Sequence, residues 1–366
     1  METMGMSLVN FYQGKTVLVT GHTGFKGSWI CETLHLLGAN VVGYALQPND
    51  KNNLYDLLQL DQKLQSHLAP MQDFKRLNKV FQEVQPEIVF HMAAQPLVRE
   101  SYKNPVYTYE TNVMGTVHLM ECVRLNSCVR SVVNITTDKV YENKEWQRGY
   151  REEDRLNGYD PYSNSKSCSE LVTDAYRKSF FSQRENLSVS TVRSGNVIGG
   201  GDFAKDRIIP DCFRAVQNQE KIILRSPYSV RPYQHVLEPI FVYLRLAELQ
   251  HRNQVYAGAY NVGPNDSDCL QTKELVQAFC DQWNDLNDVS LVWEVTKEAN
   301  PLHEANLLRL DCDKIKKVLN WHPVWEIQVG MKKTVEWYDA YRKNQDMCKF
   351  TTQQILEYVE NMKYGK

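Results

Sequence analysis

The chain has 366 residues, of which 42% are hydrophobic, enough for one large α/β domain with a smaller companion. A formal net charge of −2 and the lack of any long uncharged apolar run argue against a nucleic-acid-binding or membrane-spanning protein. Residues 1–10 have neither a basic start nor an apolar stretch, and nine cysteines are scattered without a CxxC pair, so we expect free thiols and a cytoplasmic location.

Strands and helices alternate through the first half of the chain. Short apolar, β-branched runs predict strands at residues 15–20, 40–44, 87–91 and 130–136. Helical patterns separate them, as far as Leu37 after the first strand and over 113–124 before the last. This alternation favours an α/β fold built on a doubly wound, Rossmann-like parallel sheet. From about Ser194, shorter elements predict a smaller mixed α/β domain, and residues 352–363 predict a lone amphipathic helix.

A glycine-rich turn follows the first predicted strand directly. Its residues are Gly21, Thr23, Gly24, Phe25, Lys26 and Gly27. Glycines at such a turn permit its dihedrals and let the backbone approach a pyrophosphate at the start of the helix. An ordinary glycine turn is the alternative, but the position between a strand and a helix favours a dinucleotide site. Residues 43–47, after the second strand, hold neither a carboxylate nor an arginine, so this region does not decide between NAD and NADP.

Tyr162 and Lys166 lie four residues apart after Asp160-Pro161, a turn that starts a helix. Residues at this spacing share one helix face. A lysine ammonium near a phenol favours the phenolate and lowers the pKa of the tyrosine. We therefore expect Tyr162 to accept a proton from a substrate hydroxyl while hydride passes to a nicotinamide.

Thr137, Asp138 and Lys139, here called the Thr137 triplet, follow the strand predicted at 130–136. Ligands of open α/β sheets bind at the carboxyl ends of strands. A hydroxyl, a carboxylate and an amine together can hold a substrate hydroxyl, protonate a leaving group and remove a carbon-bound proton. A polar loop with a solvated charge pair is the alternative, and the neighbouring Tyr162 and Lys166 favour the catalytic interpretation.

Several longer stretches resemble the CDP-glucose 4,6-dehydratase family of extended short-chain dehydrogenases/reductases. They are residues 21–29, 91–99, 111–117, 160–163, 195–202 and 231–239. The resemblance implies an internal redox cycle: hydride passes from C4 of the glucose to NAD, a proton leaves C5 and water leaves C6, and the hydride returns to C6. Relatives that act on dTDP-glucose carry Asp-Glu where this chain has Asp138-Lys139, so the resemblance implies CDP-glucose as the substrate.

The resemblance also implies the roles of individual residues. Tyr162 deprotonates the C4 hydroxyl, Asp138 is the acid at C6, Lys139 takes part in the C5 proton step, and Thr137 binds substrate. NAD is held by the glycine turn together with Ala93, Ala94, Gln95, Asn112, Tyr162 and Lys166. Substrate contacts are Asn196, Arg207, Arg231 and His303, and no metal site is expected.

The same resemblance divides the chain and predicts its partners. Residues 11–193 form the NAD-binding domain with the Tyr162 helix, and 194–350 form mainly the substrate-binding domain, with some segments returning to the first. Residues 351–366 form a C-terminal helix or tail. The nucleotide sugar is the expected ligand, with no nucleic acid and no membrane, and two subunits pair through helices into a homodimer.

Some positions depart from the family pattern. Ala69-Pro70 stands where Gly-Asp is usual, and Ala45 also removes a polar contact, so we expect the adenosine half of the cofactor to be held differently. Another nucleoside diphosphate hexose is an alternative substrate. A sugar-nucleotide epimerase or a non-catalytic cofactor sensor would share the fold; Asp138 and Lys139 argue against the first, and the presence of both Tyr162 and Lys166 against the second.

Overall fold

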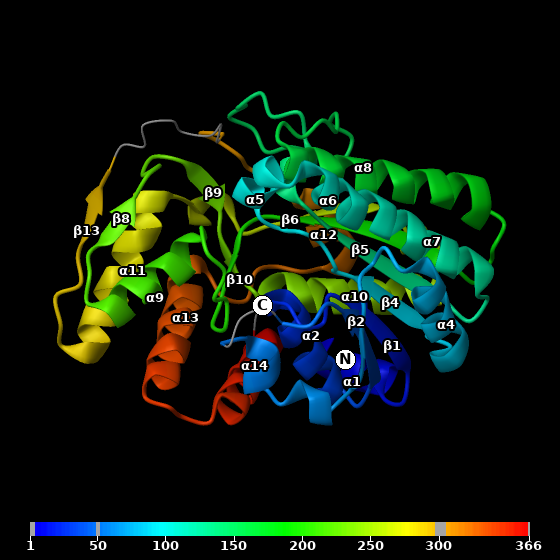
Figure 1. The fold of residues 1–366 in the computed structure, drawn as a ribbon, viewed down its shortest axis with the longest axis horizontal. Coiled ribbons are helices and arrows are strands. Elements are labelled where there is room, and N and C mark those ends of the chain that lie inside the picture. Colours follow the sequence, from blue (N-terminus) through cyan, green and yellow to red (C-terminus); the bar gives the residue numbers. More distant parts are fainter. Residues whose placement is uncertain (1–3, 49–51, 297–304, 365–366) are drawn as a thin grey trace.

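A seven-stranded parallel sheet forms the centre of the computed structural model, which describes residues 4–48, 52–296 and 305–364 (Figure 1). Its strand order is β11-β6-β5-β4-β1-β2-β3. The strands are β1 (Thr16–Thr20), β2 (Asn40–Ala45), β3 (Gln65–Leu68), β4 (Ile88–His91), β5 (Ser131–Thr137), β6 (Ser188–Ser194) and β11 (Ala259–Val262). The predicted doubly wound α/β fold is thus confirmed. The order reverses between β1 and β4, the point at which such sheets bind their ligands.

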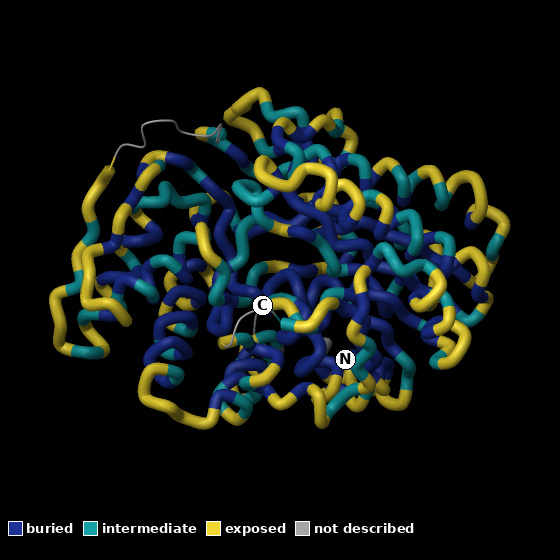
Figure 2. The backbone as a smooth tube through the Cα atoms, in the orientation of Figure 1, coloured by how far each residue is buried: buried dark blue, intermediate teal, exposed yellow. Residues whose placement is uncertain are grey.

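Helices cover both faces of the sheet because its strands bury side chains on both sides. Val17 and Val19 of β1 join one apolar cluster, while Leu18 between them joins the other. The first face carries α1 (Met4–Tyr12), α2 (Phe25–Leu36), α10 (Leu237–Arg252) and α14 (Met347–Tyr364). The second carries α4 (Phe74–Val84), α7 (Gly115–Leu125) and α8 (Pro161–Tyr176). Figure 2 shows the buried backbone running through the middle of these layers.

The second half of the chain contributes to both parts of the molecule. Strand β11 extends the large sheet beside β6, in register from Ala259 with Thr191. The smaller part, at the left of Figure 1, holds two of the three remaining strand pairs of the described chain and three long helices. These are β8 (Ile222–Leu224) with β13 (Trp293–Val295), β9 (Val230–Pro232) with β12 (Cys269–Gln271), α9 (Ile208–Asn218), α11 (Thr272–Asn287) and α13 (Ile327–Arg342).

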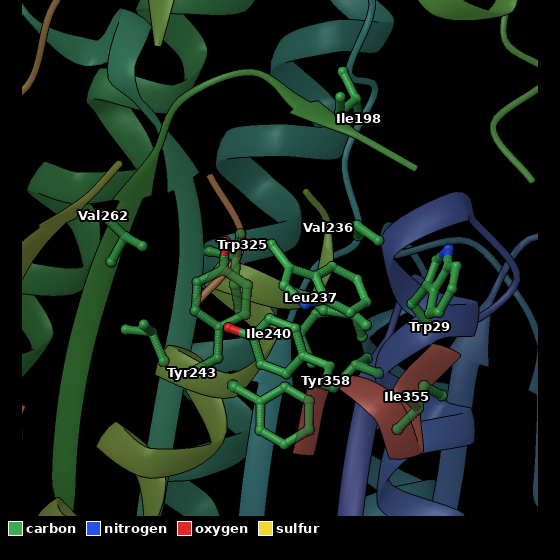
Figure 3. Packing of buried hydrophobic residues seen from close by; sticks show 14 of the residues in the cluster. Trp29, Ile198, Val236, Leu237, Ile240, Tyr243, Val262, Trp325, Ile355 and Tyr358 are labelled. Atoms are coloured by element: carbon green, nitrogen blue, oxygen red, sulfur yellow. The ribbon is translucent and has the colours of Figure 1, made fainter. Parts of the chain in front are cut away.

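The C-terminal helix differs from the expectation of a lone element over 352–363. Helix α14 begins at Met347, and its Ile355 and Tyr358 are buried in the main apolar cluster. The rings of Tyr358 and Phe241 of α10 stack with centroids 4.9 Å apart, and Figure 3 shows Tyr358 beside Trp325. Amphipathic periodicity predicted the helix but not the partner that covers its apolar face.

Across the described ranges, no helix combines the length and apolar character of a membrane span. All nine cysteines are free, as predicted.

Candidate active site

A cavity of about 900 Å³ opens at the carboxyl ends of the sheet strands. Its walls come from the glycine turn after β1, the ends of β5 and β6, the start of α8, and the smaller part of the molecule from Asp202 to Leu308. Three separate stretches singled out in the sequence therefore meet in one space.

The glycine turn packs its backbone tightly against neighbouring segments. Gly21 has φ +77°, and a Cβ there would lie 2.7 Å from the Ala93 nitrogen. A Cβ on Gly27 would lie 2.0 Å from the Gly21 carbonyl oxygen. Gly24 caps α2 without any side-chain hydrogen bond, so the first backbone N–H groups of the helix are left for an anion. This geometry fits a dinucleotide diphosphate.

Tyr162 and Lys166 both line the cavity from the first turns of α8. Asp160 caps this helix by accepting from the Ser163 nitrogen at 3.0 Å, and Lys166 Nζ donates to the Ile135 carbonyl of β5 at 3.2 Å. Burial lowers the pKa of Lys166 to about 8. Burial also raises the pKa of Tyr162 to about 12, partly offset by a hydrogen bond with Thr137 and the charge of Arg207. The expected lowering of the tyrosine pKa is therefore not found, because desolvation outweighs the nearby positive charge.

Within the Thr137 triplet, the Lys139 amine faces the cavity and the Asp138 carboxylate lies behind the cavity wall. Thr137 and Lys139 line the cavity, whereas Asp138 is fully buried. Asp138 Oδ1 accepts from Thr137 Oγ1 at 2.9 Å and pairs with Lys139 Nζ at 3.5 Å. Within the described chain, Asp138 Oδ2 has no hydrogen-bond partner. Lys139 Nζ also donates to Asn196 Oδ1 at 3.2 Å, which brings one predicted substrate residue to the triplet.

Three further cations complete a positively charged wall. Lys26 Nζ donates to Ser194 Oγ at 3.0 Å, and burial together with Arg207 and Lys166 lowers the pKa of Lys26 to about 7. Arg207 pairs with Asp202 at 2.8 Å, and the Asp202 carboxylate raises the pKa of the Arg207 guanidinium. Arg231 is buried, and its guanidinium donates to the Val230 carbonyl at 2.9 Å and to the Ala305 carbonyl. Guanidinium and ammonium groups at one cavity suit a diphosphate.

Two predicted cofactor residues lie behind the cavity wall. Ala93 and Ala94 line the cavity, but Gln95 and Asn112 do not. The Asn112 side chain accepts from the Gln95 nitrogen at 2.8 Å and donates to Ser165 Oγ at 2.9 Å. These two residues therefore fasten the loop after β4 to helix α8. His303 lies outside the described residues.

The cavity end beside β2 and β3 contains Ala45 and Ala69, two of the positions that depart from the family pattern. Ala45, Leu46, Ala69, Met71 and Gln72 line it, without a carboxylate. Thr23 lies on the wall as well, and its hydroxyl donates to the Leu46 carbonyl at 2.8 Å.

Sequence reasoning missed several residues of the site. Arg99 and Arg225 line the cavity and both approach Asp206 Oδ1, at 3.8 and 3.2 Å. No motif surrounds Arg225, so the sequence held no signal for it. Glu170 lies one helical turn after Lys166 on α8, and that spacing is a signal that could have been used.

Comparison with known proteins gives consistent matches over nearly the whole chain. Residues 18–334 match the family described as GDP-mannose 4,6 dehydratase. The chain is 46% identical over 355 residues to CDP-glucose 4,6-dehydratase of Salmonella typhimurium, covering 96% of this chain and 98% of that protein. It is 24% identical to dTDP-glucose 4,6-dehydratase 1 of Escherichia coli, covering 91% and 95%.

Solved structures share the fold. The dTDP-glucose 4,6-dehydratase of Bacillus anthracis, in complex with NAD, superposes with a TM-score of 0.75 at 22% identity, covering 91% of this chain and 99% of that one. A UDP-glucose-4-epimerase of Stenotrophomonas maltophila, with bound NAD and formylated UDP-arabinopyranose, superposes with a TM-score of 0.78 at 20% identity, covering 90% and 99%.

Proposed function

The chain belongs to the GDP-mannose 4,6-dehydratase family, and from this premise we propose that it dehydrates CDP-glucose to CDP-4-keto-6-deoxyglucose with NAD as cofactor. The observation that carries the proposal is the meeting of Thr137 and Lys139 with Tyr162 and Lys166 at one cavity, with Asp138 bonded to Thr137 directly behind the wall. The enzyme is a hydro-lyase, and its product is of the kind used in deoxysugar biosynthesis.

The glycine turn and the uncapped start of α2 hold the cofactor diphosphate, and Ala93, Ala94, Tyr162 and Lys166 line the space beside it. When bound, NAD stores the hydride between its removal from C4 and its return to C6 of the sugar. Gln95 and Asn112 act indirectly, since they hold the loop that carries Ala93.

The protein side chains move the protons. Tyr162 Oη takes the proton of the C4 hydroxyl, aided by its hydrogen bond with Thr137 and by the charge of Arg207, both of which favour the phenolate. Lys139 Nζ, which faces the cavity, removes the C5 proton. Asp138 is the acid for the leaving C6 hydroxyl; its carboxyl is buried behind the cavity wall, and Thr137 Oγ1, which lines the cavity and bonds to Asp138 Oδ1 at 2.9 Å, connects it to the substrate. Asn196, Arg207 and Arg231 bind the substrate diphosphate, and His303 is proposed to lie near the substrate.

The domain roles follow from these sites. Residues 11–193 bind NAD and carry the Tyr162 helix, while 194–350 supply most substrate contacts. Residues 351–366 are proposed as the C-terminal helix or tail, of which the part up to Tyr364 belongs to α14.

We also propose a cytoplasmic homodimer. Three neighbouring elements expose large apolar side chains: helix α6 (Pro105–Tyr109), the π-helical segment Glu110–Met114 and helix α8. Val106 is 69% exposed, Leu171 57% and Met114 45%, and a second copy of the same face would cover them. Light scattering of the purified protein should give twice the chain mass, and a monomeric mass would contradict the dimer.

The activity is tested by incubating the purified protein with CDP-glucose and NAD. The expected product has lost one water, shows the alkaline absorbance of a 4-keto sugar, and forms without net NADH. Parallel reactions with dTDP-, UDP- and GDP-glucose test the nucleotide. A product of unchanged mass would indicate an epimerase and contradict the dehydration.

A further inference from the structure

A buried ion pair lies directly beneath the catalytic segments. Glu170 on α8 and Arg193 on β6 are 2.9 Å apart, with side chains only 3% and 4% exposed. Neither residue lines the cavity. A buried ion pair gives little net stability, because desolvation of the charges opposes their attraction. Its presence here therefore calls for another explanation.

The pair is bonded to both flanks of the Thr137 triplet. Glu170 Oε1 accepts from the hydroxyl of Thr136, the residue immediately before the triplet. Arg193 Nη1 donates at 2.8 Å to the hydroxyl of Tyr141, two residues after the triplet. Tyr141 in turn donates to Asn261 Oδ1 at 2.6 Å, so this flank is fixed to β11 as well.

The same pair is tied to the helix that carries Tyr162 and Lys166. Glu170 lies one turn beyond Lys166, and Lys166 Nζ donates to Ile135, the residue before Thr136. Thr136 and Arg193 are themselves opposite each other in the β5–β6 register. Strand β5, strand β6 and helix α8 thus meet at a single buried pair of charges.

We propose that Glu170 and Arg193 are positioning residues of the dehydration, which hold the Thr137 triplet at a fixed distance from Tyr162 and Lys166. This inference rests on the proposed function. Proton transfers at C4, C5 and C6 require the three acid–base groups to keep one mutual geometry, and displacements near 1 Å at such groups cost about 10²-fold in rate.

Thr136→Val tests the proposal with little disturbance, because it removes only the hydroxyl that joins Glu170 to the triplet. Thr173→Val is the matched control. Thr173 also joins α8 to β5, through Asn134 Nδ2 at 2.9 Å, but one turn farther from the cavity. Each variant is isosteric and loses two buried hydrogen bonds, so both melting temperatures should fall, and that of Thr136→Val should fall more because its partner Glu170 is charged.

The two variants should differ in rate. We expect kcat of Thr136→Val with CDP-glucose to fall about 10- to 100-fold, with KM changed less than about threefold, while Thr173→Val keeps the wild-type kcat. If the wild type is active and the two variants have equal kcat values, the positioning role of Glu170 and Arg193 is overturned while the proposed function stands. An inactive wild type would overturn the proposed function and the inference with it.

Glu170→Gln gives a second readout that a purely structural role would not move. Besides Glu170, the charged and titratable groups that sense Lys166 are Lys26 of α2 and His91 of β4. Of the groups in the described ranges, Glu170 alone favours the protonated lysine. Loss of the Glu170 charge should lower the pKa of Lys166. In the folded Glu170→Gln enzyme, the alkaline limb of the kcat/KM profile should therefore shift to lower pH than in wild type. An unmoved limb would contradict the link between Glu170 and Lys166.

Discussion

Replacement of Gly27 by alanine tests the tightest backbone packing of the cavity. The added Cβ would lie 2.0 Å from the Gly21 oxygen and 2.8 Å from both the Gly21 carbonyl carbon and His22 Cα. All three are backbone atoms, so no flexible side chain can move aside. Overpacking of this kind costs about 1–3 kcal/mol or more. The better helix propensity of alanine returns at most about 1 kcal/mol.

Gly24→Ala is the matched control for this clash. Its Cβ would meet only the Gly21 oxygen, at 3.4 Å, and the residue is exposed with φ −80°. We expect its free energy of unfolding to stay within about 1 kcal/mol of wild type.

Urea unfolding and calorimetric titration with NAD separate the two effects. Gly27→Ala should lose both stability and NAD affinity, since the turn itself must shift. Gly24→Ala should stay folded but bind NAD more weakly, because its methyl group occupies the approach to the helix N-terminus. A Gly27→Ala protein within about 0.5 kcal/mol of wild-type stability would refute the packing argument.

Two other predictions concern the acid–base groups of the reaction, and a third concerns the carboxyl of Glu238, which is buried and accepts from the backbone of Val324 and Trp325. Tyr162→Phe should lower kcat by about 10²- to 10⁴-fold, and an unchanged thermal melt would show that the loss is catalytic; activity near wild type would exclude Tyr162 as the base. Asp138→Asn keeps an acceptor for Thr137 Oγ1 but cannot protonate the C6 hydroxyl, so water loss measured by mass spectrometry should fall at least about 10²-fold. Burial raises the pKa of Glu238 from 4.5 to about 7, so the folded protein holds this proton more tightly than the unfolded chain. Stability should therefore fall by about 3 kcal/mol as pH rises through that window. Unfolding titrations should show a flatter profile for Glu238→Gln, and identical profiles would contradict the raised pKa.

The candidate catalytic groups could be located from the sequence because each lies in a local pattern. The glycine turn, the strand end before Thr137 and the spacing of Tyr162 and Lys166 all depend on residues close in the chain. The parallel sheet then brings strand ends together at one edge, as the alternation of strands and helices predicted. The resemblance to CDP-glucose 4,6-dehydratases is likewise confirmed by the match over 96% of the chain.

Features that depend on tertiary contacts could not be predicted. Glu170 and Arg193 meet only because β6 pairs with β5 in a particular register. Gln95 and Asn112 belong to a family motif, but whether a motif residue faces the ligand or supports a loop depends on side-chain direction. The pKa of Tyr162 depends on how deeply α8 is covered, which spacing does not reveal.

The internal hydride cycle is tested most directly with CDP-glucose that carries deuterium at C4. The protein is incubated with this substrate and NAD, and the product is examined by mass spectrometry and by NMR of its C6 methyl group. We expect the product to have lost one water and to carry the deuterium at C6, transferred there from C4. Three outcomes would contradict the proposed reaction. The deuterium could be lost to solvent, be found in free reduced cofactor, or stay at C4 in a product of unchanged mass.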